Sequence, residues 1–148
     1  MLKLPPPIWA LLILVLTVSA SYMAGWPIVP WADSPSIGIL LIAFSFIAPV
    51  WALILFRRAG TQVNTTSATN HKLITDGPFR FTRNPMYLGL VLLSLGVAVA
   101  TGAMIIFLAP VLVFAIANWV HIPFEEAKMR RQFGPAFDAY TRNVRRWL

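Results

Sequence analysis

Long apolar stretches separated by short polar segments dominate the chain. Between Lys3 and Arg57 the one charged residue is Asp33, which lies in a proline-rich turn. The apolar runs on either side of this turn, residues 8–25 and 37–56, would be about 27 and 30 Å long as helices, which is enough to cross the hydrocarbon core of a bilayer. The two runs therefore predict two transmembrane helices.

A second charge-free stretch extends from Pro85 to Phe124. Residues 86–120 alone would measure about 52 Å as one helix, which is too long for a single crossing, so this stretch must fold back on itself. Thr101-Gly102 is the best turn candidate, and it gives two shorter spans, residues 86–100 and 103–120. The pattern therefore predicts an all-α integral membrane protein with four transmembrane helices.

The C-terminal residues follow a different pattern, in which apolar side chains recur every three to five positions with basic residues between them. This spacing is typical of an amphipathic helix that lies on the membrane surface. We expect such an interfacial helix over residues 123–148, with a break near Gly134-Pro135. Its arginines are expected to contact anionic lipids, and residues 1–148 are expected to form a single membrane domain.

The twelve basic residues fall before the first span, between the second and third spans, and after the fourth. Because short cytoplasmic loops collect Lys and Arg, four spans place all three segments and both termini in the cytoplasm. The compact chain and the absence of sorting signals suit a prokaryotic inner membrane. Val18-Ser19-Ala20 also resembles a signal-peptide cleavage site, but the three prolines at 5–7 and the weak basic flank favour a retained first helix.

Composition excludes several classes of function. The chain is 58% hydrophobic and 11% charged, whereas a soluble domain typically has about 25% charged residues. The deficit excludes an ordinary soluble globule, a disordered chain and a solvated nucleic-acid-binding domain. The chain has no cysteine, so it offers no thiolate nucleophile and no iron–sulfur cluster. With two histidines in all, we expect no histidine-based metal site.

Two cytoplasmic segments concentrate the polar side chains that can carry chemistry. Residues 57–85 combine turn formers, aromatic residues and cations directly before the third span, which suits a pocket where Arg80 or Arg83 holds an anionic or amphipathic small molecule. Alternatively, these arginines only anchor the loop to lipid phosphates. After the fourth span, the adjacent carboxylates of Glu125 and Glu126 either bind a ligand or cap the start of a new helix.

Two blocks of the sequence share a known pattern. The first, Leu73 to Gly89, contains Gly-Pro-Phe, Arg-Asn-Pro and Tyr-Leu-Gly, and the second contains Glu125-Glu126, Phe133-Gly134 and Tyr140. These blocks resemble the isoprenylcysteine carboxyl methyltransferase and phospholipid methyltransferase superfamily, whose members are small integral-membrane enzymes that use S-adenosylmethionine. The resemblance covers Leu73 to Leu148, about half of the chain, and the first two helices carry no comparable signature.

The resemblance implies where the cofactor and the chemistry lie. It implies a cytoplasmic cofactor-binding loop at residues 57–85 and a lipophilic acceptor that enters from the bilayer. The cofactor-binding residues that it implies are Leu73, Ile74, Gly77, Arg83, Asn84, Pro85, Tyr87, Gly89, Glu125 and Glu126. His121, Glu126 and Arg83 are the candidate catalytic residues. A glutamate can accept hydrogen bonds from the ribose hydroxyls or the ammonium of the cofactor, and an arginine can pair with its carboxylate.

His121 is where the sequence departs most from the family pattern. Relatives that methylate a carboxylate tend to have Arg five residues before the second glutamate, so His121 favours an amine or hydroxyl acceptor over prenylcysteine. His121 is a candidate general base, a substrate contact or a simple interfacial residue. Two other functions stay open: an NADPH-dependent membrane reductase of the sterol-reductase type, and a non-enzymatic protein that docks lipids or a partner.

Overall fold

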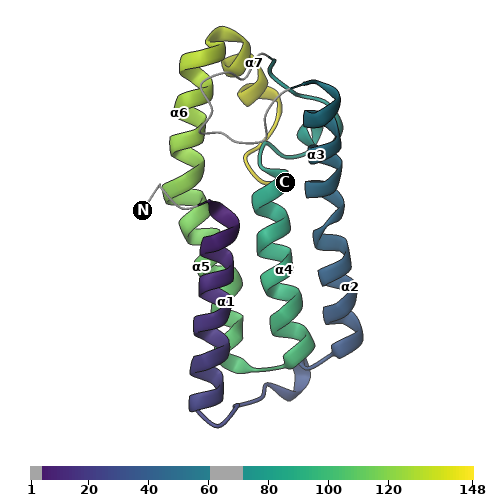
Figure 1. Cartoon of the computed structure of the whole chain (residues 1–148), viewed down its shortest axis with the longest axis vertical. Coiled ribbons are helices and arrows are strands. Elements are labelled where there is room, and N and C mark those ends of the chain that lie inside the picture. The colour runs from purple at the N-terminus through teal and green to yellow at the C-terminus, as the bar shows by residue number, and fades with distance from the viewer. Residues whose placement is uncertain (1–4, 61–71) are drawn as a thin grey trace.

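The computed structural model describes residues 5–60 and 72–148, and it is all-α within these ranges. Four helical rods lie side by side and alternate in direction along the chain (Figure 1). The rods are α1 (Pro6–Met23), α2 with α3 (Pro35–Ser45 and Ile47–Arg58), α4 (Pro85–Thr101), and a long helix that contains α5 (Leu108–Ile116) and α6 (Ile122–Phe133). Part of the expected cofactor loop, residues 61–71, lies outside the described residues.

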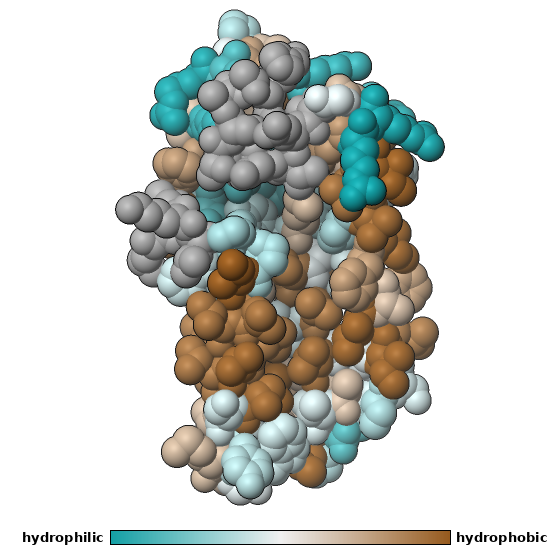
Figure 2. Space-filling model, in the orientation of Figure 1, coloured by the Kyte–Doolittle hydropathy of each residue, from teal (hydrophilic) through white to brown (hydrophobic). Residues whose placement is uncertain are grey.

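The rods have the length and composition of membrane spans. Residues 6–23, 35–58 and 104–133 are each long and apolar enough to cross a bilayer, and α4 is a shorter apolar helix. On the face shown in Figure 2, a brown apolar band covers the middle of the molecule, and the most strongly teal side chains gather mainly at one end. The predicted segments 8–25, 37–56 and 86–100 match three of these rods, so the protein is an integral membrane protein with the expected apolar helices.

Both short connections between rods lie at the same end of the molecule, opposite the polar end (Figure 1). The backbone N–H of Val29 donates to the carbonyl of Gly102 at 2.8 Å, and the N–H of Met104 donates to the carbonyl of Pro27 at 2.8 Å. Gly102 has a φ of 60°, a left-handed conformation that glycine adopts without a steric cost. The predicted turn at Thr101-Gly102 is therefore confirmed.

Small residues occupy much of the interior, whereas many large apolar side chains point outward. The buried positions include six alanines (Ala10, Ala52, Ala98, Ala103, Ala109 and Ala117), while Leu16, Met23 and Ile39 are more than half exposed. Without water to drive them together, membrane helices associate by close backbone packing, which small residues permit. The closest packing is between α2 and α4, because a Cβ atom added at Gly38 would collide with the backbone of Ala100.

The second rod is interrupted at Phe46, between α2 and α3. Pro49 explains the interruption, since proline has no N–H to donate to the carbonyl of Ser45 and its ring would clash with that carbonyl. Pro49 also lies against α4, where a Cβ atom added at Gly89 would collide with its ring. The apolar pattern of residues 37–56 predicts one uninterrupted helix, because hydrophobicity alone does not show that Pro49 interrupts it.

The fourth span does not end at residue 120 as predicted. Residues 104–133 form one continuous helix, about 45 Å long at 1.5 Å per residue, so its last turns, which carry charged residues, extend well beyond a 30 Å hydrocarbon core. A π-helical turn at Ala117–His121 precedes Pro123. In an α-helical turn the pyrrolidine ring of Pro123 would clash with a backbone carbonyl of the preceding turn, and the wider π turn avoids this clash. Pro123 therefore lies within the helix and does not begin a separate one.

The C-terminal segment is helical only in part. A break at Gly134 separates α6 from α7 (Pro135–Asn143), as predicted. The helix expected to reach residue 148 instead ends at Asn143, and Val144 is already extended, with φ −124° and ψ 131°. Residues 144–148 turn back toward the start of α4 because the loop there offers them hydrogen-bond donors, which the periodicity of the apolar residues cannot reveal.

Candidate active site

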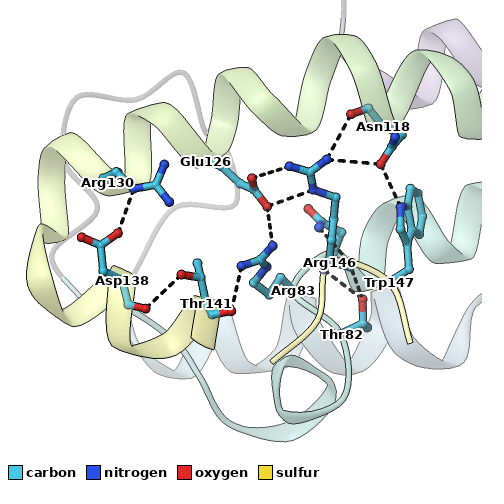
Figure 3. A network of polar contacts seen from close by, with 10 residues as sticks. Thr82, Arg83, Asn118, Glu126, Arg130, Asp138, Thr141, Arg146 and Trp147 are labelled. Atoms are coloured by element: carbon cyan, nitrogen blue, oxygen red, sulfur yellow. Dashed lines mark hydrogen bonds and ion pairs between the residues drawn. The ribbon is translucent and has the colours of Figure 1, made fainter. Parts of the chain in front are cut away.

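Three segments that are distant in the sequence meet at the polar end of the molecule. They are the loop before α4, the part of the long helix around residues 118–126, and the extended C-terminal residues 144–147 (Figure 3). The two sequence blocks that carry the family resemblance therefore face each other in space. At their meeting point, Glu126 lies between Arg83 and Arg146 (Figure 3).

Glu126 binds both arginines through its two carboxylate oxygens. Its Oε1 atom lies 3.0 Å from Nη2 of Arg83, and its Oε2 atom lies 2.7 Å from Nη2 of Arg146. Nε of Arg146 also donates to Oε1, at 3.2 Å. The Glu126 side chain is 15% exposed, so these contacts are charge-assisted hydrogen bonds in a partly dehydrated environment, where they are stronger than on an open surface.

Arg83 has donors that the protein does not fully use. Its side chain is 14% exposed, and its Nε atom is buried without a hydrogen-bond partner among the described residues. Its Nη1 atom reaches only the carbonyl of Thr141, at 3.4 Å. Buried polar groups in native proteins nearly always have partners, so this Nε is a donor whose acceptor the described residues do not supply.

Asn84 is buried and holds the C-terminal segment. Its amide Nδ2 donates to the carbonyl of Arg146 at 2.9 Å, and the hydroxyl of Thr82 donates to the same carbonyl at 3.1 Å. On the other side of the loop, the hydroxyl of Tyr140 donates to the carbonyl of Phe79 at 2.7 Å. Burial raises the pKa of Tyr140 to about 12, which keeps this hydroxyl protonated as a donor at neutral pH.

The second glutamate has a different partner. The hydroxyl of Tyr87 donates to Oε1 of Glu125 at 2.8 Å, and the Tyr87 ring lies 6.2 Å from the ring of His121. The predicted site residues Tyr87, Glu125 and His121 therefore form one group, next to the group of Arg83 and Glu126. Tyr87 is buried near the start of α4. Its hydroxyl therefore holds the carboxylate of Glu125 from a fixed position.

His121 is 6% exposed, and its Nε2 atom has no hydrogen-bond partner among the described residues. It lines a cavity of about 10 Å³ together with Trp9, Ala10, Tyr87 and Val113. The cavity is apolar apart from His121 and Tyr87, and it lies between α1, α4 and α5. Within the described part of the chain, His121 therefore has an unpartnered ring nitrogen beside an apolar cavity whose volume is about that needed for one water molecule.

The remaining predicted residues shape the loop and its packing. Gly77 has a φ of 61°, and a Cβ atom there would lie 2.6 Å from the Leu55 side chain. Gly89 lets α4 approach the break between α2 and α3, and Pro85 begins α4. Leu73 and Ile74, both half-buried, lead into a wide cleft of about 690 Å³ lined by Thr75, Asp76, Arg80, Ala136, Ala139, Tyr140, Asn143 and Val144. This volume is within the range of small-molecule sites.

Sequence reasoning did not identify Arg146 as a site residue, because it was interpreted as one of several lipid-contacting arginines. It also did not identify the role of Asn118, whose Oδ1 atom accepts hydrogen bonds from Arg146 at 3.3 Å and from Nε1 of Trp147 at 3.1 Å. One signal was available. With five acidic against twelve basic residues, a partly buried carboxylate is expected to attract more than one cation.

Comparison with known proteins places these features in a family. The family model for phospholipid methyltransferase matches residues 34–136, so the match begins at α2 and includes a span in which the sequence alone showed no signature. Protein-S-isoprenylcysteine O-methyltransferase B from Arabidopsis thaliana is 28% identical over 112 residues, which are 72% of this chain and 55% of that protein. The chain thus spans about half the length of this curated relative.

No solved structure matches the chain. The family model covers more than two thirds of the sequence, and it includes both the Arg83–Tyr87 region and the paired glutamates. This chain therefore belongs to the phospholipid methyltransferase family.

Proposed function

We propose that this protein is a membrane-embedded methyltransferase that transfers a methyl group from S-adenosylmethionine to a lipophilic acceptor. One observation carries the proposal: in a chain that belongs to this family, the family's Arg-Asn-Pro segment and paired glutamates meet in space, with Glu126 3.0 Å from Arg83. When bound, S-adenosylmethionine supplies an electrophilic methyl group on a sulfonium, which a heteroatom of the acceptor attacks in line.

The residues present fit a cofactor with an amino-acid end. The buried Nε of Arg83 lacks an acceptor among the described residues, and the carboxylate of the cofactor would supply one. Glu125, oriented by the Tyr87 hydroxyl, would accept hydrogen bonds from the ribose or the ammonium. Leu73, Ile74, Gly77, Asn84, Pro85 and Gly89 would form the loop and helix start around the cofactor.

The acceptor would approach His121 from the bilayer. His121 lines the apolar cavity between α1, α4 and α5, and its Nε2 atom is unpartnered within the described part of the chain. A neutral imidazole there would accept the proton that a hydroxyl or an amine acceptor loses when its oxygen or nitrogen bonds to the methyl group. Arg83, held by Glu126, would fix the amino-acid end of the cofactor and through it the position of the reacting methyl group.

The location of the site follows from the same geometry. Among the described residues, those of α3, the loop before α4, α6 and the C-terminal segment bring their basic side chains to the end that carries Arg83 and Glu126 (Figure 2), and by the positive-inside rule this supports a cytoplasmic location for that end and for both termini. A prokaryotic inner membrane suits this arrangement, with anionic lipids in contact with the exposed arginines. The Arabidopsis relative is named as an isoprenylcysteine O-methyltransferase, and His121 leads us to propose an amine or a hydroxyl in place of its acceptor.

The test is calorimetric titration of the detergent-purified protein with S-adenosylhomocysteine and, separately, with NADPH. We expect micromolar binding of S-adenosylhomocysteine, no binding of NADPH, and loss of binding in the double variant Glu125→Gln/Glu126→Gln. Binding of NADPH alone would instead support a reductase. If the folded protein binds neither ligand, a lipid-docking protein becomes the better hypothesis.

A further inference from the structure

The extended C-terminal segment is held against the loop before α4 by three hydrogen bonds. The backbone N–H of Arg83 donates to the carbonyl of Arg145 at 3.0 Å, and Asn84 and Thr82 both donate to the carbonyl of Arg146. The next residue, Trp147, packs on Phe114 with ring centroids 4.7 Å apart. These contacts fix the backbone of Arg146 and direct its guanidinium to the centre of the site (Figure 3).

The charges of the cluster formed by Arg83, Glu126 and Arg146 do not cancel. Two guanidinium groups and one carboxylate leave one positive charge, on side chains that are 14%, 15% and 32% exposed. The carboxylate of Glu125 lies next in the chain, where the Tyr87 hydroxyl donates to it; this bond orients the carboxylate but leaves its charge unchanged. A partly dehydrated net positive charge is costly unless an anion compensates it, so the cluster is suited to a negatively charged ligand group.

The cluster also has more hydrogen-bond donors than acceptors. Both oxygens of Glu126 are already used by the two arginines. The Nε atom of Arg83 is unpartnered among the described residues, and Nη1 of Arg146 reaches the Asn118 side chain only at 3.3 Å. An oxygen acceptor would therefore meet donors that Glu126 does not use, whereas an ammonium group would meet two cations.

We infer that Arg83 and Arg146 together bind the carboxylate of the cofactor's amino-acid moiety, and that Glu126 is a positioning residue that holds the two guanidinium groups for this purpose. The inference rests on the proposed function. It extends the cofactor site to Arg146, which lies beyond residues 34–136, the part matched by the family model. It also assigns Glu126 a partner in the protein, so that Glu125 alone is left to accept from the cofactor.

A lipid phosphate is the other source of a negative charge at a membrane surface. The burial of Arg83 and Glu126 argues against it, because a headgroup would meet the exposed arginines 142 and 145 first. The cofactor carboxylate is carried on a small molecule that can enter between the loop and the long helix. The two sources make different predictions for variants of Arg146 and Arg142.

The experiment measures binding of two ligands that differ only in the carboxylate: S-adenosylhomocysteine and its decarboxylated analogue. Calorimetry in detergent on the full chain compares the wild type with Arg146→Gln and with Arg142→Gln, a control that removes the same charge from an exposed position of α7. The wild type is expected to bind S-adenosylhomocysteine about 10- to 100-fold more tightly than the analogue, as for a charge-assisted hydrogen bond. Arg146→Gln should lose most of this preference and leave the analogue's affinity nearly unchanged, whereas Arg142→Gln should keep the preference.

Two further variants test the role of each side chain. Arg146→Lys keeps the charge but loses the planar, two-pronged donor geometry, so it should retain part of the preference. Glu126→Gln should reduce the preference for S-adenosylhomocysteine while leaving the affinity of the analogue unchanged, since the analogue does not use the cluster. Equal weakening of both ligands by Glu126→Gln would show that Glu126 binds the cofactor directly, which would overturn its assignment as a positioning residue.

The outcomes separate this inference from the proposed function. If the wild type binds both ligands equally well, the proposed function stands and the inference is wrong. If the folded wild type binds neither, both are wrong. If Arg146→Gln leaves both affinities unchanged but lowers the phosphatidylglycerol retained in nanodiscs, measured by native mass spectrometry, Arg146 binds lipid and the inference is overturned.

Discussion

The structure contains two acid–arginine pairs of nearly equal geometry but different burial, and this difference predicts their contributions to stability. Glu126 lies 2.7 Å from Arg146, and Asp138 lies 2.8 Å from Arg130. The Glu126 side chain is 15% exposed, whereas the side chains of Arg130 and Asp138 are 54% and 42% exposed. Water therefore screens the second pair much more than the first.

Replacing Glu126 by Gln removes the charge but keeps the shape. The amide nitrogen would then face guanidinium donors, and two partly buried cations would lose their counter-charge. Breaking a fully buried pair costs about 3–5 kcal/mol, and the residual exposure of Arg146 reduces this to about 2–3 kcal/mol. For a chain of this size, that corresponds to a fall of roughly 5 to 10 °C in the thermal unfolding midpoint.

The assay is thermal unfolding in a mild detergent, followed by tryptophan fluorescence, for the wild type, Glu126→Gln and Asp138→Asn. Asp138→Asn makes the same carboxylate-to-amide change in the exposed pair, and its midpoint should remain within experimental error of the wild type. The reasoning would be refuted if both variants lost the same stability, or if Glu126→Gln unfolded at the wild-type temperature. Either result would mean that burial does not decide the contribution of these pairs.

Two further predictions concern packing and pH. Gly96→Ala should lower the unfolding midpoint by an amount equivalent to about 1–3 kcal/mol, since the new Cβ atom would lie 2.7 Å from the Ile42 side chain and 2.9 Å from its backbone nitrogen; an unchanged midpoint in the same thermal assay would contradict this close contact of α2 with α4. Burial raises the pKa of Tyr140 from its usual 10.0 to about 12, so its contribution to stability should be complete below pH 10 and decrease as the pH rises from 10 to 12, because the unfolded state loses this proton first. Denaturant titrations over this pH range should show a weaker pH dependence in Tyr140→Phe, and identical slopes in the two proteins would contradict the assignment.

The spans were predictable because membrane insertion depends on hydrophobicity summed along one segment, which is a local property of the sequence. The turn at Gly102 and the break at Gly134 were predictable for a similar reason, since glycine and proline act on the backbone where they stand. The sequence did not predict the interruption of the second rod at Phe46 or the continuity of the long helix through Pro123. In both places, the effect of a proline depends on how the helix widens or ends around it.

The candidate site was predictable only where the family motifs lie. Arg83, Tyr87 and the two glutamates were identified, and the structure brings them together at one end of the molecule. Arg146 was not identified, because its role depends on an extended backbone whose carbonyl accepts hydrogen bonds from Thr82 and Asn84. A periodic pattern of apolar residues can indicate a helix, but it cannot show where tertiary hydrogen bonds end it.

The π-helical turn at Ala117–His121 has a consequence for insertions and deletions. Successive residues of an α-helix are rotated by about 100° around its axis, and a π turn accommodates one additional residue. Deleting one residue from this turn would therefore restore a regular helix with little rotation of the later side chains, whereas the same deletion in a uniform α-helix would rotate every later side chain by about 100°. Glu126 would then still face Arg83, so the turn lets the orientation of this site survive the loss of one residue, and the cost of the deletion would fall on Pro123, whose ring needs the wider turn.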